Sequence, residues 1–248
     1  NILFGRNPRL RDEYNRLFNA IFSNPEDCKK IIRLLAKKHI GFTREEIAKE
    51  TGLPLGGGLT DTLNALAESD FVQRYNPYDK SGKTVYYKLI DNFSLFWLKY
   101  VECHQSSADF MTDNMASNIM KSWRGVAFEE LCWQHIRQIK QALGIAGVSS
   151  TISAWGVKGT DETDGVQIDL LIIRNDNVVN LCEMKFSGGT YTIDKDEEIK
   201  LRNRIETLKG TLSPRQTVHL TLVTTFGLSN GKHSGIVQKQ VELDDLFN

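Results

Sequence analysis

The chain has 248 residues, 40% of them hydrophobic, and it carries 31 Lys plus Arg residues against 31 Asp plus Glu residues. A chain of this size and composition can bury a sizeable core, most simply as two domains. The balanced charge excludes a uniformly basic coat protein, so any nucleic-acid site must be a local patch.

Targeting and redox signals are few. The sequence has four cysteines without a CxxC pair, which favours reduced thiols over a disulfide framework. It has no apolar run long enough for a bilayer and no signal-peptide pattern. We therefore expect a soluble, cytoplasmic protein without a membrane partner. Because the chain opens at Asn1 without an initiator Met, we also expect it to be part of a longer polypeptide.

The N-terminal third predicts a winged helix. Residues 1–24 should form a connecting helix, and Pro25 should open the next one. Thr43 and Glu46 have the spacing of a capping box, which predicts a helix start. Another helix, two short strands and a polar turn between them follow. This order is that of a winged helix-turn-helix, which we assign to residues 25–92.

DNA contact by that domain is one interpretation. The helix expected at 59–69 would enter a major groove, and Lys80 and Lys83 in the wing would lie near phosphate. The exposed positions of the helix, such as Asp61 and Glu68, are acidic, however, and would repel phosphate. Since winged helices also serve as rigid connectors or protein-docking units, both interpretations stay open.

Residues 93–122 are expected to form a helical joint, in which an aromatic helix packs the two domains together. The apolar residues of 123–143 then recur at helical spacing and predict one amphipathic helix. Helical geometry places Glu129 at the edge of its buried stripe and points Glu130 away. Cys132-x-x-His135 could hold zinc on one helical face, although no second ligand pair accompanies it.

Residues 165–186 predict a β-hairpin that carries charges. With a three-residue loop at 175–177, the register places Asp169 opposite Glu183, and Lys185 shares their face because side chains alternate along a strand. Charges among apolar neighbours are costly to desolvate without a compensating cation. A hard divalent metal ion would supply one.

The region after the hairpin predicts a charged helix at 194–209 and a strand at 217–226. Most of the helical charge should be a solvated face with i,i+4 pairs such as Glu198 with Arg202. The remaining cations, with Lys195 and Arg202 as candidates, could contact phosphate.

The order Asp169, then Glu183-x-Lys185, resembles the PD-(D/E)xK nuclease superfamily, although Ile168 stands where a Pro is common. Glu129 at the start of its helix resembles that superfamily's first acidic motif. Together with the winged helix and residues 191–195, 220–227 and 241–247, nearly the whole chain resembles the C-terminal region of AAA-type archaeal and bacterial ATPases, in which a DUF234-like nuclease-like domain follows the winged helix. No GxxxxGK[ST] is present, so ATP is expected to act only through a P-loop domain outside this chain.

The resemblance implies a mixed α/β chain with a restriction-endonuclease-like domain at 123–248, a mixed sheet flanked by helices. It further implies metal-dependent hydrolysis of phosphodiester bonds in nucleic acid. Asp169, Glu183 and Glu129 would hold Mg²⁺ or Mn²⁺, and Lys185 would orient or activate water. The expected partners are nucleic acid and the N-terminal ATPase domain. The alternative is a non-catalytic DNA- or protein-binding regulatory module that retains a nuclease-like fold.

Overall fold

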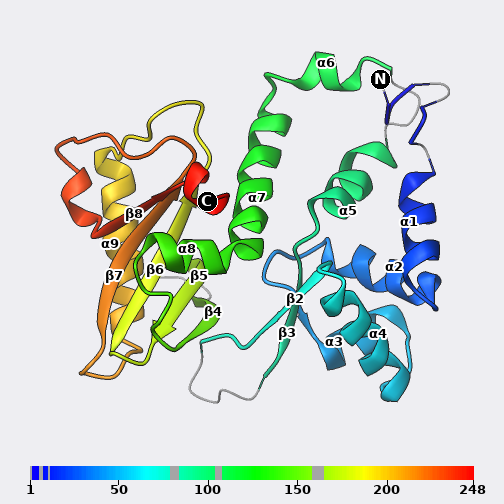
Figure 1. The fold of residues 1–248 in the computed structure, drawn as a ribbon, viewed down its shortest axis with the longest axis horizontal. Helices are drawn as coiled ribbons and strands as arrows, with labels where there is room; N and C mark the ends of the chain where they lie inside the picture. Colours follow the sequence, from blue (N-terminus) through cyan, green and yellow to red (C-terminus); the bar gives the residue numbers. More distant parts are fainter. Residues whose placement is uncertain (1, 6–7, 11, 79–83, 104–107, 158–164) are drawn as a thin grey trace. The chain divides into compact units, whose positions relative to one another are not determined.

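The computed structural model describes residues 2–5, 8–10, 12–78, 84–103, 108–157 and 165–248 (Figure 1). The chain has the mixed α and β composition that its sequence predicts, and the described residues form one three-stranded and one five-stranded sheet. Its contacts divide it into two compact units. The first comprises Asn1–Tyr75 and Thr84–Glu130, and the second Asn76–Lys83 and Leu131–Asn248. The division falls within a helix, a few residues after the boundary expected at Trp123.

The helices and strands of the first unit follow one another in the order predicted for a winged helix. They are α1 (Glu13–Ile21), α2 (Pro25–Leu35), β1 (Phe42–Thr43), α3 (Arg44–Thr51), α4 (Gly57–Glu68), β2 (Val72–Tyr75), β3 (Tyr86–Leu89), α5 (Asn92–Phe96), a π-helical turn (Trp97–Val101), α6 (Phe110–Asn114) and α7 (Asn118–Gln134). The antiparallel sheet has the order β1-β3-β2. The predicted capping box is present: Glu46 N donates to Thr43 Oγ1 at 3.2 Å, and Thr43 N donates to Glu46 Oε2 at 2.8 Å.

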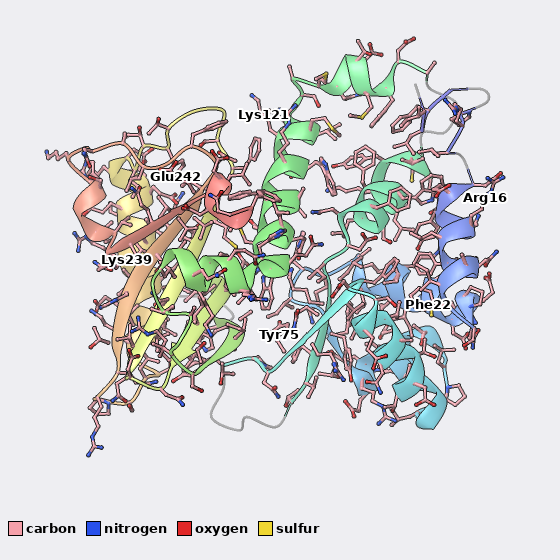
Figure 2. The ribbon with its side chains drawn as sticks, viewed as in Figure 1. Arg16, Phe22, Tyr75, Lys121, Lys239 and Glu242 are labelled. Atoms are coloured by element: carbon pink, nitrogen blue, oxygen red, sulfur yellow. The ribbon has the colours of Figure 1, made fainter. Side chains whose placement is uncertain are left out.

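Aromatic side chains fill the core of the first unit. Phe22, labelled in Figure 2, packs edge-on against Phe71 with ring centroids 5.4 Å apart. Tyr14 stacks on Trp97 at 5.8 Å. The aromatic segment predicted as a joint between domains therefore belongs to this core, in which Trp97 and Tyr100 are both buried.

The second unit is built on the five-stranded sheet. Its elements are α8 (Ile136–Ala142), β4 (Ser150–Val157), β5 (Val166–Arg174), β6 (Val178–Lys185), α9 (Lys195–Lys209), β7 (Thr217–Thr224) and β8 (Lys239–Glu242), with short 3-10 turns at Ser234–Ile236 and Leu243–Leu246. The strand order is β4-β5-β6-β7-β8. Neighbours are antiparallel from β4 to β6 and parallel from β6 to β8.

The loop residues that follow β2 contact the second unit's sheet, whereas β2 and β3 pair in the three-stranded sheet. Tyr78 N donates to Ala154 O at 3.0 Å, and Ser153 Oγ donates to Asn76 O at 2.7 Å, so these residues are held on β4. Lys80 and Lys83, the predicted phosphate contacts in the wing, lie outside the described residues.

Two predictions about the helix at 123–143 are wrong. The helix is interrupted at His135, which separates α7 from α8 and has φ −112° and ψ 28°. The His135 ring nitrogen Nδ1 lies 2.9 Å from the Leu131 carbonyl oxygen, the acceptor one helical turn back. Glu130 does not point to solvent either: its side chain is 1% exposed, because Lys88 Nζ on β3 donates to its Oε1 at 2.5 Å.

The predicted hairpin is present with its predicted register. Pairing runs from Leu170 with Cys182 to Ile173 with Val179. The loop has three residues, and Asn177 adopts a left-handed φ of 64°, which asparagine tolerates better than most residues. None of the described helices is long and apolar enough to cross a membrane.

Candidate functional site

Strand β6 brings two charges to the sheet face that α9 covers. Val179 and Leu181 are fully buried on that face, in the same cluster as Leu201 of α9. Because side chains alternate along a strand, Glu183 and Lys185 continue the same row. The row thus passes from apolar to charged toward the end of β6.

Helix α9 contributes two further charged side chains to the same site. Glu197, Leu201, Arg204 and Leu208 follow the i, i+4, i+7, i+11 spacing of one helical face. The two leucines are fully buried, so the face packs against the sheet. Its two charged members are therefore carried toward β6.

The four charged side chains form what we term the ion network: Glu183, Lys185, Glu197 and Arg204. Lys185 Nζ lies 2.9 Å from Glu183 Oε1 and 2.8 Å from Glu197 Oε1. Arg204 donates from an η nitrogen to Glu183 Oε2 at 2.6 Å. Both oxygens of Glu183 are thus engaged by cations. The side chains are 12–28% exposed, so water and solutes can reach them.

Asp169 lies beside this network. The β5–β6 pairing ends at Leu170 with Cys182, and the same register extended by one residue places Asp169 opposite Glu183. Its Oδ1 accepts a hydrogen bond from Gln167 Nε2 at 2.6 Å. Burial opposes the charge on Arg204, but Glu183 and, with smaller effects, Glu197 and Asp169 raise its pKa above the ordinary value. Asp169 and Glu183 therefore act on the same guanidinium.

Burial also opposes the charge on Lys185, but Glu183 and Glu197 outweigh it and raise the lysine pKa above its usual range. Tyr191 is half-buried nearby. Burial raises its pKa, Lys185 opposes that shift, and Glu197 adds to it. Backbone pairing fixes the tyrosine, since Tyr191 N donates to Gly227 O at 2.8 Å.

The other predicted site residues are placed elsewhere. Glu129 is half-buried on α7, in the first unit. Lys195 is exposed at the first residue of α9. Arg202 is also exposed and forms the predicted pair with Glu198 at 2.5 Å, while Glu198 also contacts His233 Nδ1 at 2.5 Å. The structure therefore groups Asp169, Glu183 and Lys185, and gives Arg202 an internal partner.

Within the described ranges, no group of three or more His, Cys, Asp or Glu side chains has the arrangement of a metal site. The residues that sequence reasoning missed are Glu197 and Arg204. Their spacing could have identified them, because they lie seven residues apart on the same helical face as the buried Leu201 and Leu208. The many other charged residues of the helix made this pattern hard to recognise.

No protein-family model matches the sequence, and no functionally curated protein matches it. Among solved structures, the chain is similar to the crystal structure of AF1548, a protein of unknown function, with 16% sequence identity and a TM-score of 0.32. The match covers 47% of this chain and 64% of that one.

Proposed function

We propose that the second unit is a divalent-cation-dependent phosphodiesterase acting on nucleic acid, with Asp169, Glu183 and Lys185 at its centre. The observation that carries this proposal is the position of two carboxylates and an ammonium on one face of adjacent antiparallel strands, with Glu183 12% and Lys185 27% exposed. Metal-dependent phosphoryl chemistry needs this combination of anionic oxygen ligands and a nearby cation.

The donor set fits Mg²⁺ or Mn²⁺. Asp169 and Glu183 supply hard carboxylate oxygens, and Mg²⁺ is characteristically held by one or two carboxylates while water and substrate phosphates complete its shell. When bound, such an ion offsets the repulsion between the carboxylates and polarises a phosphoryl oxygen. Glu129 is proposed as a further ligand on the motif resemblance alone.

Lys185 acts in this proposal as a fixed positive charge. A lysine of ordinary pKa is already protonated at neutral pH, and the carboxylates beside Lys185 raise its pKa further. A protonated lysine cannot take a proton from water, so we assign it to stabilising the negative charge that develops on phosphate. The sequence-based hypothesis had Lys185 orient or activate water and also gave a cation beside the phosphate this charge-stabilising role.

Two exposed aromatic side chains support a nucleic-acid substrate. Phe186 directly follows β6 and is 43% exposed, and Phe226 follows β7 and is 55% exposed. Ser187 N donates to Thr225 Oγ1 at 3.0 Å, which joins the two strand ends. Exposed phenyl rings offer stacking surfaces for unpaired bases.

A second candidate function also has an observation in its favour. Both oxygens of Glu183 already accept from Lys185 and Arg204, as in an ion cluster that needs no metal. In that case the unit would be a non-catalytic nucleic-acid- or protein-binding module. The resemblance to AAA-type ATPases is compatible with either candidate function and rests on the motif order alone. Under both candidates, an ATPase domain would be the expected partner.

A cleavage panel separates the two candidates. Single-stranded, duplex and branched DNA and RNA would be incubated with the chain and Mg²⁺ or Mn²⁺. We expect cleavage of at least one substrate, abolished by chelation and by Asp169→Asn. Asp196→Asn, at an exposed position in the first turn of α9, is the matched control and should cleave normally. Binding without cleavage under all metals would favour the non-catalytic module.

A further inference from the structure

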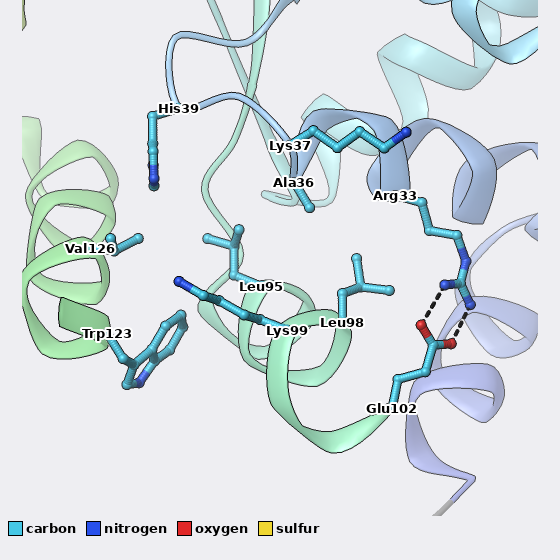
Figure 3. Close-up of a pocket in the computed structure, with 10 residues that line it drawn as sticks. All are labelled: Arg33, Ala36, Lys37, His39, Leu95, Leu98, Lys99, Glu102, Trp123 and Val126. Carbon is cyan, nitrogen blue, oxygen red and sulfur yellow. Dashed lines mark hydrogen bonds and ion pairs between the residues drawn. The ribbon is translucent and has the colours of Figure 1, made fainter. Parts of the chain in front are cut away.

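The first unit contains a pocket of about 630 Å³ that the nuclease-like proposal does not use. Side chains of α2, α5, the π-helical turn and α7 line it (Figure 3). Its volume lies within the range of small-molecule sites, which are mostly apolar with a few placed polar groups.

The pocket has an apolar wall that is held in place. Leu95, Leu98 and Val126 contribute aliphatic surface, and Trp123 contributes an indole ring. The indole packs against Phe96, with the two ring centroids 5.3 Å apart, and this contact restricts its orientation. A rigid aromatic surface of this kind can receive a flat ring without losing side-chain entropy on binding.

The polar groups differ between the two ends of the pocket. At one end, Arg33 donates two hydrogen bonds of 2.6 Å to the carboxylate of Glu102, so the two charges neutralise each other (Figure 3). At the other end, Lys99 and His39 extend toward Val126. The His39 backbone is fixed there, because Lys88 Nζ donates to its carbonyl oxygen at 3.0 Å.

Lys99 and Leu98 reach the pocket from the π-helical turn Trp97–Val101. Such turns are rare and are found frequently at functional sites. With Arg33 paired to Glu102, the cations that remain at the pocket are Lys37 and Lys99. His39 also lines the pocket, with its Nδ1 3.8 Å from the buried Glu130 Oε1.

We propose that this pocket binds a small organic anion that carries a flat ring. The ring lies against Trp123 and the aliphatic wall, and the anionic group, a carboxylate or a phosphate, lies between Lys99 and His39. Charge-assisted hydrogen bonds would fix the anion, and apolar burial would hold the ring. The inference uses the first unit alone and does not depend on the proposed phosphodiesterase.

Calorimetric titration of the full chain with four probes tests this site. Adenosine monophosphate and 2-naphthoate carry a ring and an anion, adenosine carries the ring alone, and inorganic phosphate carries the anion alone. We expect at least one of the first two to bind about tenfold or more tightly than both partial probes. The better of the two identifies phosphate or carboxylate as the preferred anion.

Variants locate the binding. Lys99→Met should weaken the better probe about tenfold, since it removes a charged hydrogen-bond partner. Lys38→Met is the matched control, because its ammonium lies 5.1 Å from the Phe42 ring centroid and does not line the pocket. Unchanged melting temperatures would show that both variants fold. Inorganic phosphate or adenosine binding as tightly as the ring-bearing anions, equal losses in both variants, or no binding by any probe at millimolar concentration would overturn the proposal.

Discussion

Each unit buries an ion pair, but at a different depth. In the first unit, Lys88 and Glu130 have side chains only 7% and 1% exposed. In the second, the ion network of Glu183, Lys185, Glu197 and Arg204 is 12–28% exposed. In the buried pair, a charge that loses its partner is left unpaired, because no solute can reach it. In the partly exposed network, a charge that loses its partner can bind a solute instead. The ion network, and not the deeper pair, is therefore suited to bind a ligand.

The largest effect is expected at the sealed pair. Lys88→Met leaves the buried Glu130 carboxylate without its ammonium partner and with only His39 Nδ1 nearby, at 3.8 Å, which costs about 3–5 kcal/mol of unfolding free energy. Chemical denaturation would measure it. Lys209→Met, whose side chain is 50% exposed and pairs with Glu206, should cost about 0.5 kcal/mol or less. The double variant Lys88→Met with Glu130→Met should recover most of the loss. A single-variant loss as small as that of the Lys209 control would contradict the account.

A smaller effect on stability, with a gain in metal affinity, is expected at Arg204. Arg204→Met removes the hydrogen bond to Glu183 Oε2 and should cost about 1–3 kcal/mol. It also frees an oxygen for a metal ion, so Mn²⁺ affinity measured by calorimetry should rise. Arg202→Met, on the same helix with a 62% exposed side chain, should leave both quantities near the parent values. Unchanged or weaker Mn²⁺ binding in Arg204→Met would show that arginine and metal do not share Glu183.

The smallest effect is expected at the exposed pair of Arg33 and Glu102, whose side chains are 48% and 36% exposed. Glu102→Gln should cost about 0.2–1 kcal/mol at pH 7. The hydrogen bond from Arg33 lowers the Glu102 pKa, so this stabilisation is present above the ordinary carboxylate pKa and is lost as the pH falls through the lowered value. Urea melts at pH 7 and pH 3 should therefore differ in the parent-to-variant gap. An equal gap at both pH values would contradict this.

Local rules predicted those parts of the fold that local chemistry determines. The capping box at Thr43 and the hairpin register around Leu170 depend on neighbours within a few residues or across one turn. The face shared by Glu183 and Lys185 follows from strand alternation alone.

The rest depended on partners distant in the sequence. Glu130 is buried against Lys88, a partner 42 positions away in the sequence. Helical periodicity cannot reveal such a distant pairing. Tyr78, in the loop after β2, is held by Ala154, and the approach of Arg204 to Glu183 requires that α9 return across the sheet. The helix break at His135 could not be predicted, because no proline or glycine lies beside it in the sequence.

If Asp169 and Glu183 hold a divalent cation, Mn²⁺ should raise the melting temperature of the protein through these two residues. An ion that binds only the native state at a hundred times its dissociation constant adds about 2.7 kcal/mol of stability. We predict a Mn²⁺-induced rise in the parent and in Asp196→Asn, and none in Asp169→Asn. An equal rise in the parent and Asp169→Asn, or no rise in the parent, would show that these carboxylates belong to an ordinary charged sheet face.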